Sequence, residues 1–315
     1  MLGLCLLTAT ELRIRYPTFF INKIRQFKLM PSNTFYDKPS LALYDTQFWG
    51  INPQGQPCAV DDKKACVWIA SSFFDATLSS ASYNHLSKPS EKTTLHTLQK
   101  QAVRQLFHKL LNQLPIANEC VNNKIDRQTT ATCNLGIVDN RGAIPPQTAL
   151  NTKLSLDESR YPYRLQPLGH TVSFSHSQNT VACALSTVGA IGIDIEQNPI
   201  PTKIGQRFFS HDEQSWLQQL PITEQQQALN LLWMLKEAHG KYQVAASATT
   251  ANLMHALGVD LLLPAQALID MAQQPNALSL ASVHQASNNS IESSRQYLYH
   301  PRHAWAVVYD MGLAL

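Results

Sequence analysis

Residues 170–196 read HTVSFSHSQNTVACALSTVGAIGIDIE and contain three short apolar runs, at 172–174, 181–185 and 191–195. The polar segments SQN and STVGA separate these runs. Short apolar and β-branched runs bounded by Gly, Asn and Ser are typical of strands joined by tight turns. The stretch therefore predicts three consecutive strands of an antiparallel meander.

Helical spacing of apolar residues predicts a helix over 93–114, followed by Pro115, and two more over 208–219 and 224–242. Thr223 with Gln226 three residues later predicts a capping box at the start of the last helix. Further strands are expected at 66–74, 278–284, 295–299 and 303–309. Because strands and helices do not alternate strictly, we expect an α+β fold rather than a doubly wound sheet.

The chain is long enough for two packed lobes, since single cores rarely grow beyond about 250–300 residues. We expect an N-terminal extension over 1–60, a first lobe over 61–158 and a second lobe over 159–315 that carries the candidate site. The junction is expected in the polar, loop-rich stretch 118–158, and the alanine- and leucine-rich segment 245–275 is interpreted as an insertion.

Composition excludes several classes of protein. Charged residues make up 15% of the 315 residues and the net charge is +3, without a dense Lys/Arg stripe, so we expect no nucleic-acid partner. No apolar run is long enough to span a membrane, and the first residues lack the basic start and cleavage site of a signal peptide. Six scattered cysteines without a CxxC pair indicate reduced thiols, so we expect a cytoplasmic protein.

The motif IGIDIE at 191–196 places two carboxylates, Asp194 and Glu196, two residues apart on an expected strand. Side chains at i and i+2 share one face, and two acids on one face repel unless a cation lies between them. The isoleucines take the other face, toward a core, and Gly192 leaves room beside the acids. The alternative interpretation is an exposed strand face with two solvated acids.

The motif WMLKEAHGK at 233–241 places Trp233, Glu237 and Lys241 on one helical stripe, with Lys236 on the adjoining face. The alternative is a surface Glu–Lys pair, which is worth only a few tenths of a kcal/mol. A tryptophan on the same stripe argues against that alternative, because large aromatic side chains are mostly buried.

The motif FSHS ends an expected strand just before a turn. Ser175, His176 and Ser177 supply hydroxyl and imidazole groups, and the turn supplies backbone N–H groups, which together suit an anion. A purely structural histidine is the alternative. A serine hydrolase is disfavoured because a GxSxG nucleophile elbow is absent around these residues.

Taken together, the three motifs offer three carboxylates and several donors suited to phosphate. Mg²⁺ commonly binds through carboxylates and substrate phosphates, and lysine binds phosphate as a point charge. The combination predicts a magnesium site that holds a phosphorylated substrate. The chain lacks a Walker A loop, a Rossmann glycine fingerprint and the kinase signatures.

The order FSHS, IGIDIE, RFFSHDE and WMLKEAHGK resembles the 4′-phosphopantetheinyl transferases of the Sfp type, over the span from Arg160 to Lys241. The resemblance implies two similar lobes related by a pseudo-twofold axis. Each lobe would be a small antiparallel sheet packed with helices, and coenzyme A would bind in the cleft between them.

The resemblance also implies roles for individual residues. Asp194, Glu196 and Glu237 correspond to the magnesium carboxylates, and Lys236 and Lys241 to contacts with the pyrophosphate of coenzyme A. Lys241 and Lys236 would counter the charge that builds on the transferring phosphoryl group. Glu237, or a metal-bound water that it orients, is the best candidate for the base that accepts the serine proton.

Ser175 and His176 correspond to the pocket for the 3′-phosphate of coenzyme A. Arg160, in SRYPYR, resembles a basic residue that closes the same pocket, although it is displaced by one residue from the usual Arg/Lys-Pro pair. On the 93–114 helix, Lys100 and Arg104 are the nearest candidates for contacts with the adenine end.

The implied reaction moves the 4′-phosphopantetheine arm of coenzyme A to a serine of an apo acyl or peptidyl carrier protein and releases 3′,5′-ADP, with Mg²⁺ as cofactor. The carrier would serve fatty-acid, polyketide or non-ribosomal peptide synthesis, and a monomer would suffice. One alternative is a non-catalytic homologue that binds coenzyme A or a carrier protein. Another is a different Mg²⁺-dependent transferase acting on a nucleotide diphosphate.

Overall fold

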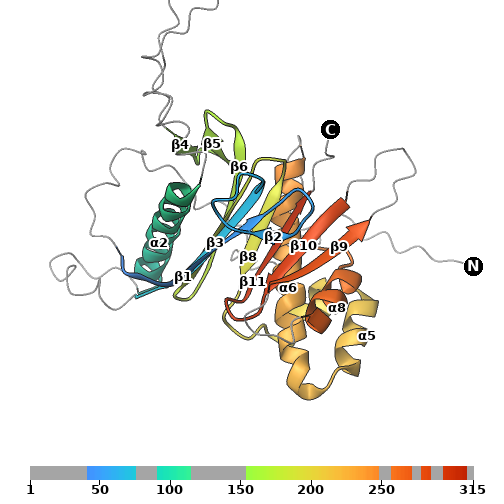
Figure 1. Ribbon diagram of the computed structural model, residues 1–315. Coiled ribbons are helices and arrows are strands. Elements are labelled where there is room, and N and C mark those ends of the chain that lie inside the picture. Colours follow the sequence, from blue (N-terminus) through green and yellow to red (C-terminus); the bar gives the residue numbers. More distant parts are fainter. Residues whose placement is uncertain are drawn as a thin grey trace, which may run out of the picture. The chain divides into compact units, whose positions relative to one another are not determined.

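The computed structural model describes residues 41–75, 91–114, 154–247, 257–271, 278–284 and 294–310. Over these residues the chain forms two antiparallel sheets and five helices (Figure 1). All of these elements belong to one unit of the chain, Ser40–Leu315. The α+β class expected from the sequence is therefore confirmed.

The larger sheet, sheet A, has seven strands in the order β2-β1-β3-β7-β6-β5-β4. Its strands are β1 (Leu43–Ile51), β2 (Pro57–Cys58), β3 (Val67–Phe74), β4 (Ser155–Asp157), β5 (Tyr163–Gln166), β6 (His170–Ser177) and β7 (Thr180–Ser186). β7 lies in the middle, and β3 beside it pairs with β1 on one side and with β7 on the other.

The smaller sheet, sheet B, has the order β8-β11-β10-β9. Its strands are β8 (Ile191–Ile195), β9 (Ser279–His284), β10 (Ser294–His300) and β11 (Trp305–Asp310). The three late strands were expected, but the predicted meander is wrong in its third member. β7 already has β3 and β6 as neighbours, so β8 leaves sheet A and pairs with β11.

Two apolar clusters hold the unit together, and β3 contributes to both because its side chains alternate. Trp68, Ala70 and Phe74 join the cluster between sheet A and helix α2. Val67 and Ile69 join the cluster between the two sheets. In β8 the isoleucines at 191, 193 and 195 enter this second cluster, as expected, and the acid between them faces the other way.

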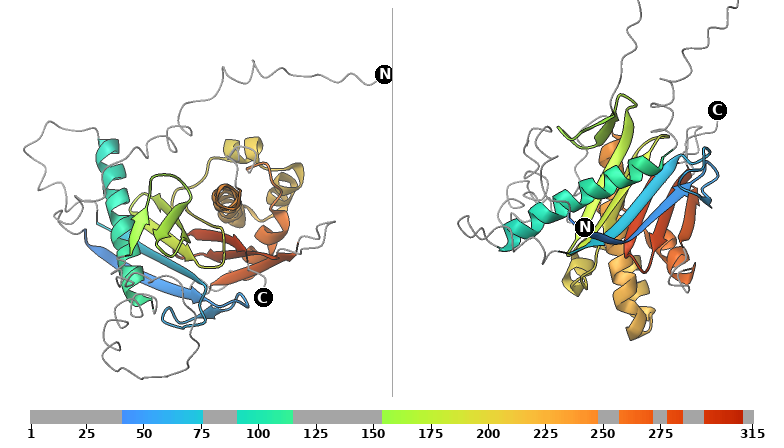
Figure 2. Two further views of the ribbon diagram at one scale, coloured as in Figure 1. Left: turned by 90° about the horizontal axis from the view of Figure 1, so that it is seen from above. Right: turned by 60° about the vertical axis from the view of Figure 1, so that its left-hand side comes forward.

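The helices are α2 (Glu91–Gln113), α4 (Thr202–Phe208), α5 (His211–Gln219), α6 (Ile222–Ala246) and α8 (Leu262–Met271). α2 lies across sheet A (Figure 2), and α6 packs against β8 and β11. The expected capping box at Thr223 is wrong, because Pro221 is the N-cap of α6. The capping box belongs to α5 instead, where Ser210 and Glu213 bond reciprocally.

Two of the expected domain limits can be compared with the observed strands. Within the expected extension 1–60, β1 pairs with β3, so residues 43–51 are part of sheet A and not irregular; residues 1–40 lie outside the described residues. The expected boundary near residue 158 falls between β4 and its partner β5. The pseudo-twofold relation of two lobes stays a prediction.

Part of the expected insertion, 245–275, is ordered as helix α8. The polar stretch 118–158, expected to join the lobes, lies outside the described residues up to 153. None of the helices in the described part of the chain combines the length and the apolar character needed to cross a bilayer.

Candidate functional site

The serines of β6 connect the two sheets at the point where β6 of sheet A passes β8 of sheet B. Ser173, Ser175 and Ser177 share one face of the strand, because residues at i and i+2 point the same way. We call these three residues the serine row. Ser173 Oγ accepts a hydrogen bond from the Ile193 N–H at 3.2 Å, and the Ser177 hydroxyl donates to Glu196 Oε1 at 2.6 Å. The row therefore sets the position of β8 over sheet A.

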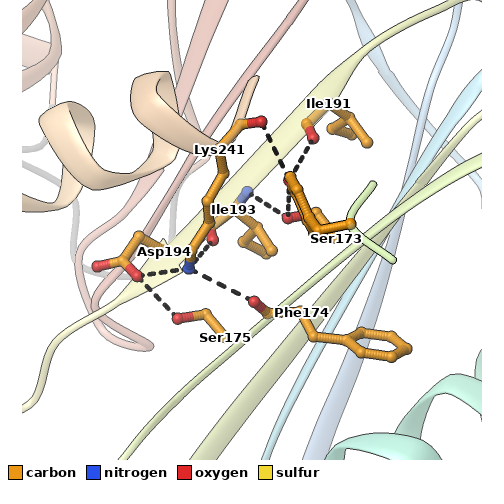
Figure 3. A network of polar contacts seen from close by, with 8 residues as sticks. Ser173, Phe174, Ser175, Ile191, Ile193, Asp194 and Lys241 are labelled. Carbon is orange, nitrogen blue, oxygen red and sulfur yellow. Dashed lines mark hydrogen bonds and ion pairs between the residues drawn. The ribbon is translucent and has the colours of Figure 1, made fainter. Parts of the chain in front are cut away.

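Asp194 is the central acid of this contact and is 2% exposed. Its Oδ1 accepts a hydrogen bond from the Ser175 hydroxyl at 2.8 Å and lies 2.8 Å from Lys241 Nζ (Figure 3). The same ammonium donates to the Ile193 carbonyl at 2.7 Å and lies 3.4 Å from the Phe174 carbonyl. An ion pair with these added hydrogen bonds offsets the cost of burying the carboxylate.

Gly192 brings α6 close to β8. A Cβ atom at this position would lie 2.0 Å from the Ala238 carbonyl oxygen and 2.6 Å from the Tyr242 nitrogen. The space that the sequence predicted beside the acids is thus filled by the backbone of α6 rather than by a ligand. This close approach is what allows the Lys241 side chain to reach Asp194.

α6 runs antiparallel to β8. Lys241 contacts Asp194, the next-to-last residue of the strand, and Asn230 donates to the Asn198 carbonyl beyond the end of the strand at 3.0 Å. A helix rises about 1.5 Å per residue and a strand about 3.3 Å. Glu237, one helical turn before Lys241, is thereby level with the C-terminal end of β8, and its side chain is half-buried.

A recess of about 250 Å³ adjoins Glu196 at this end of the strand. It is lined by Glu196, Gln197, Gln226, Gln227, Asn230, Met234, Tyr299, Pro301 and Ala304. The α6 residues among them continue the helical stripe that carries Glu237 and Lys241. Glu196 therefore lines an open recess at the end of β8.

Lys236 has a different environment from the one expected. Its side chain is fully buried, with Nζ 3.0 Å from Glu213 Oε2, and it donates to the Val259 carbonyl at 2.6 Å. Burial lowers the pKa of Lys236, while the charge of Glu213 acts in the opposite direction. The expected contact with a pyrophosphate is not available to this ammonium. Lys236 lies one residue before Glu237 on α6, so its side chain points in a different direction, toward α5 and the segment before α8.

The two FSHS residues expected in one pocket point to opposite faces of β6. Ser175 faces β8, whereas the His176 ring packs on the ring of His96 from α2, with centroids 5.3 Å apart. Alternation along a strand separates neighbouring side chains in this way. Ser175 and His176 are therefore not brought together, and His176 belongs to the contact with α2.

The other basic residues considered for coenzyme A, namely Arg160, Lys100 and Arg104, lie on the segment between β4 and β5 and on α2. Arg160 is exposed on the segment between β4 and β5. Arg104 on α2 forms an ion pair with Glu158 at 2.8 Å and donates to the Lys100 carbonyl at 2.8 Å. Burial is the main cause that lowers the pKa of Lys100.

Within the described ranges, no three His, Cys, Asp or Glu side chains form a group that could hold a metal ion. Ser175 and Ser177 hold Asp194 and Glu196 separately. The hydrogen bonds and the ion pair of Asp194 in these ranges all fall on Oδ1, and Figure 3 shows the second carboxylate oxygen pointing away from Ser175 and Lys241. The three-carboxylate metal site stays a prediction.

Residues 190–299 match the family model of the 4′-phosphopantetheinyl transferase superfamily. The resemblance predicted from the motifs is confirmed over this span, which contains β8, the helices from α4 to α8, β9 and all but the last residue of β10.

A curated relative is similar over a shorter stretch. The "4′-phosphopantetheinyl transferase gsp" of Aneurinibacillus migulanus is 39% identical over 70 residues. The aligned stretch covers 22% of this chain and 29% of the relative.

Sequence reasoning missed two parts of the site. The period-two repeat of the serine row was visible, but Ser173 was not recognised because its contact is to a backbone N–H of another sheet. Tyr161 was also missed; its hydroxyl donates to the Lys241 carbonyl at 3.1 Å, across 80 residues of sequence. No local signal in SRYPYR indicates that contact.

Proposed function

We propose that this protein transfers the 4′-phosphopantetheine arm of coenzyme A to a serine of an acyl or peptidyl carrier protein. The superfamily match over 190–299 carries the proposal, because it spans the strand and the helix that hold Asp194 and Lys241 together. The name of the relative from A. migulanus supports the same activity.

In the proposed reaction the carrier serine Oγ attacks the β-phosphorus of coenzyme A. The new Oγ–P bond forms as the bond from that phosphorus to the oxygen bridging the α-phosphate breaks. 3′,5′-ADP leaves with the bridging oxygen. The serine proton passes to the Glu237 carboxylate, which is half-buried one helical turn from Lys241.

Lys241 is the residue best suited to the charge of the diphosphate. Its ammonium already lies at the end of β8, and its side chain is 24% exposed, so it is open to a ligand on one side. A fixed positive charge in a partly buried position stabilises negative charge that develops in a transition state. We therefore expect Lys241 to act on the phosphoryl group as it transfers.

The carboxylates suit magnesium by type and all lie toward the C-terminal end of β8, where the described residues form no preassembled metal-binding group. Asp194 keeps one oxygen directed away from its serine and lysine partners, and Glu196 borders the recess at the end of β8. Glu237 is level with that end. Carboxylate oxygens are the protein ligands that Mg²⁺ prefers. We propose these three residues as its ligands. When bound, the ion would neutralise charge on the pyrophosphate.

Mass spectrometry of an apo carrier protein tests the proposed function. The carrier is incubated with this protein, coenzyme A and Mg²⁺, and the expected result is a mass gain equal to the phosphopantetheine arm on the carrier serine. Addition of EDTA should prevent the gain. A panel of acyl and peptidyl carriers that all keep their apo mass, while coenzyme A binds, would favour a non-catalytic binding protein.

A further inference from the structure

Tyr161 lies where sheet A, sheet B and α6 meet, and nothing in the resemblance gives it a role. Its hydroxyl lies 3.1 Å from the Lys241 carbonyl, 3.4 Å from Ser173 Oγ and 3.5 Å from the Ile191 carbonyl. These partners come from α6, β6 and β8 respectively. One phenol thus touches all three elements that form the site.

The directions of these hydrogen bonds follow from the donors present. Burial raises the pKa of Tyr161, so the phenol stays protonated and donates. Its single proton goes to the nearest acceptor, the Lys241 carbonyl. Ser173 Oγ accepts from the Ile193 N–H, so the Ser173 proton remains for the Tyr161 oxygen. A continuous chain of hydrogen bonds then runs from β8 through β6 to α6.

Lys241 needs such an anchor because of its place in the helix. α6 ends at Ala246, so Lys241 stands in the last two turns, where helices fray. The preceding residue is Gly240, which is less favourable in a helix than alanine. The ammonium is held at the far end of a flexible side chain by Asp194 and the Ile193 carbonyl.

We propose that Tyr161 is a positioning residue that fixes the backbone of Lys241 and thereby keeps its ammonium at Asp194. The consequence for catalysis rests on the proposed function, but the positioning itself does not. Loss of the phenol should loosen the last turns of α6, so that the Lys241 ammonium leaves its three acceptors more often.

The first test measures the reactivity of Lys241 directly, without any substrate. Wild type, Tyr161→Phe and Tyr163→Phe are treated with an amine-acetylating reagent, and the rate at Lys241 is followed by peptide mass spectrometry. Tyr163 is the matched control because its ring lies in the cluster against α2. The exposed Lys203 serves as an internal reference.

We expect Tyr161→Phe to raise the Lys241 rate about fivefold, the effect of one typical net hydrogen bond. Tyr163→Phe should leave the Lys241 rate unchanged, and the Lys203 rate should be the same in all three proteins. An unchanged Lys241 rate in Tyr161→Phe would overturn the proposal, whether or not the protein is a transferase.

The second test is a double-mutant cycle on carrier modification with Tyr161→Phe, Lys241→Ala and the combined variant. We expect Tyr161→Phe to lower kcat about fivefold with little change in the KM for coenzyme A. It should have no further effect in the Lys241→Ala background. Effects that multiply would show that Tyr161 acts independently of Lys241, which contradicts the proposal. If wild type modifies no carrier, the proposed function fails and the acetylation rates still decide the positioning role.

Discussion

Lys241 Nζ and Asp194 Oδ1 lie 2.8 Å apart and link α6 to β8 at the centre of the candidate site. The Asp194 side chain is 3% exposed and that of Lys241 24% exposed, so removal of the ammonium would leave a buried carboxylate with the Ser175 hydroxyl. The pair therefore has a structural role as well as a chemical one.

The variant Lys241→Met should lower the free energy of unfolding by roughly 3 kcal/mol, because an uncompensated buried charge remains. The double variant Asp194→Asn/Lys241→Met should recover part of this loss, since the charge is then absent. Urea denaturation of the two variants and wild type measures both effects. Equal stability of the single and double variants would show that the charge of Asp194 is not the cause.

The close approach of α6 to β8 depends on Gly192. Gly192→Ala should lower the free energy of unfolding by about 3 kcal/mol, because the new methyl group meets the Ala238 carbonyl and the Tyr242 nitrogen, which are backbone atoms. Gly205→Ala is the matched control. Its nearest neighbours are the side chains of Leu229 at 3.1 Å and Phe209 at 3.3 Å, so its cost should stay below about 1 kcal/mol. Thermal denaturation that ranks the two variants in the reverse order would contradict this account of the packing.

The buried Lys236–Glu213 pair should matter for stability and not for chemistry. Lys236→Met should cost roughly 3–5 kcal/mol, because Glu213 is left charged and fully buried. Lys236→Met/Glu213→Gln should regain part of that stability. Carrier modification by the folded double variant should remain within a few-fold of wild type. A large loss of kcat in a stable double variant would restore the role in phosphate binding that the motif suggested.

Acid should destabilise the fold through buried histidines. Burial is the main cause that lowers the pKa of His300 to about 4, and the same holds for His239. Between a pH of about 6.5 and about 4 these rings bind protons in the unfolded chain but not in the folded one, so stability falls as the pH falls through that window. Urea midpoints near pH 7 and near pH 5 measure the loss. The urea midpoints of His300→Gln at the two pH values should differ less than those of wild type. An equal difference in the variant and in wild type would show that His300 does not contribute.

The local sequence pattern was sufficient to predict the helices and strands that carry the candidate site. Apolar periodicity predicted α2, α6 and the late strands, and the i, i+2 rule separated Asp194 from the isoleucines of β8. These features depend on a residue's own neighbours in sequence, where backbone geometry dictates which face a side chain takes.

Long-range pairing set the features that sequence reasoning did not reach. β8 leaves sheet A because β3, more than 100 residues earlier, occupies the free edge of β7. Lys236 is buried because Glu213 and the Val259 carbonyl come from separate segments. Neither contact has a periodicity or a spacing that could be read along the chain.

We propose that the acids at the end of β8 and on α6 carry the transfer of the phosphopantetheine arm. The rates at which wild type and Glu237→Gln modify the same apo carrier, with coenzyme A and Mg²⁺, decide whether they do. Glu224→Gln, an exposed residue in the first turn of α6, is the control. Glu237→Gln should lose roughly a hundredfold or more in rate, while its circular dichroism and the rate of the control stay like wild type. Near-normal transfer by Glu237→Gln would rule out this role for the acids.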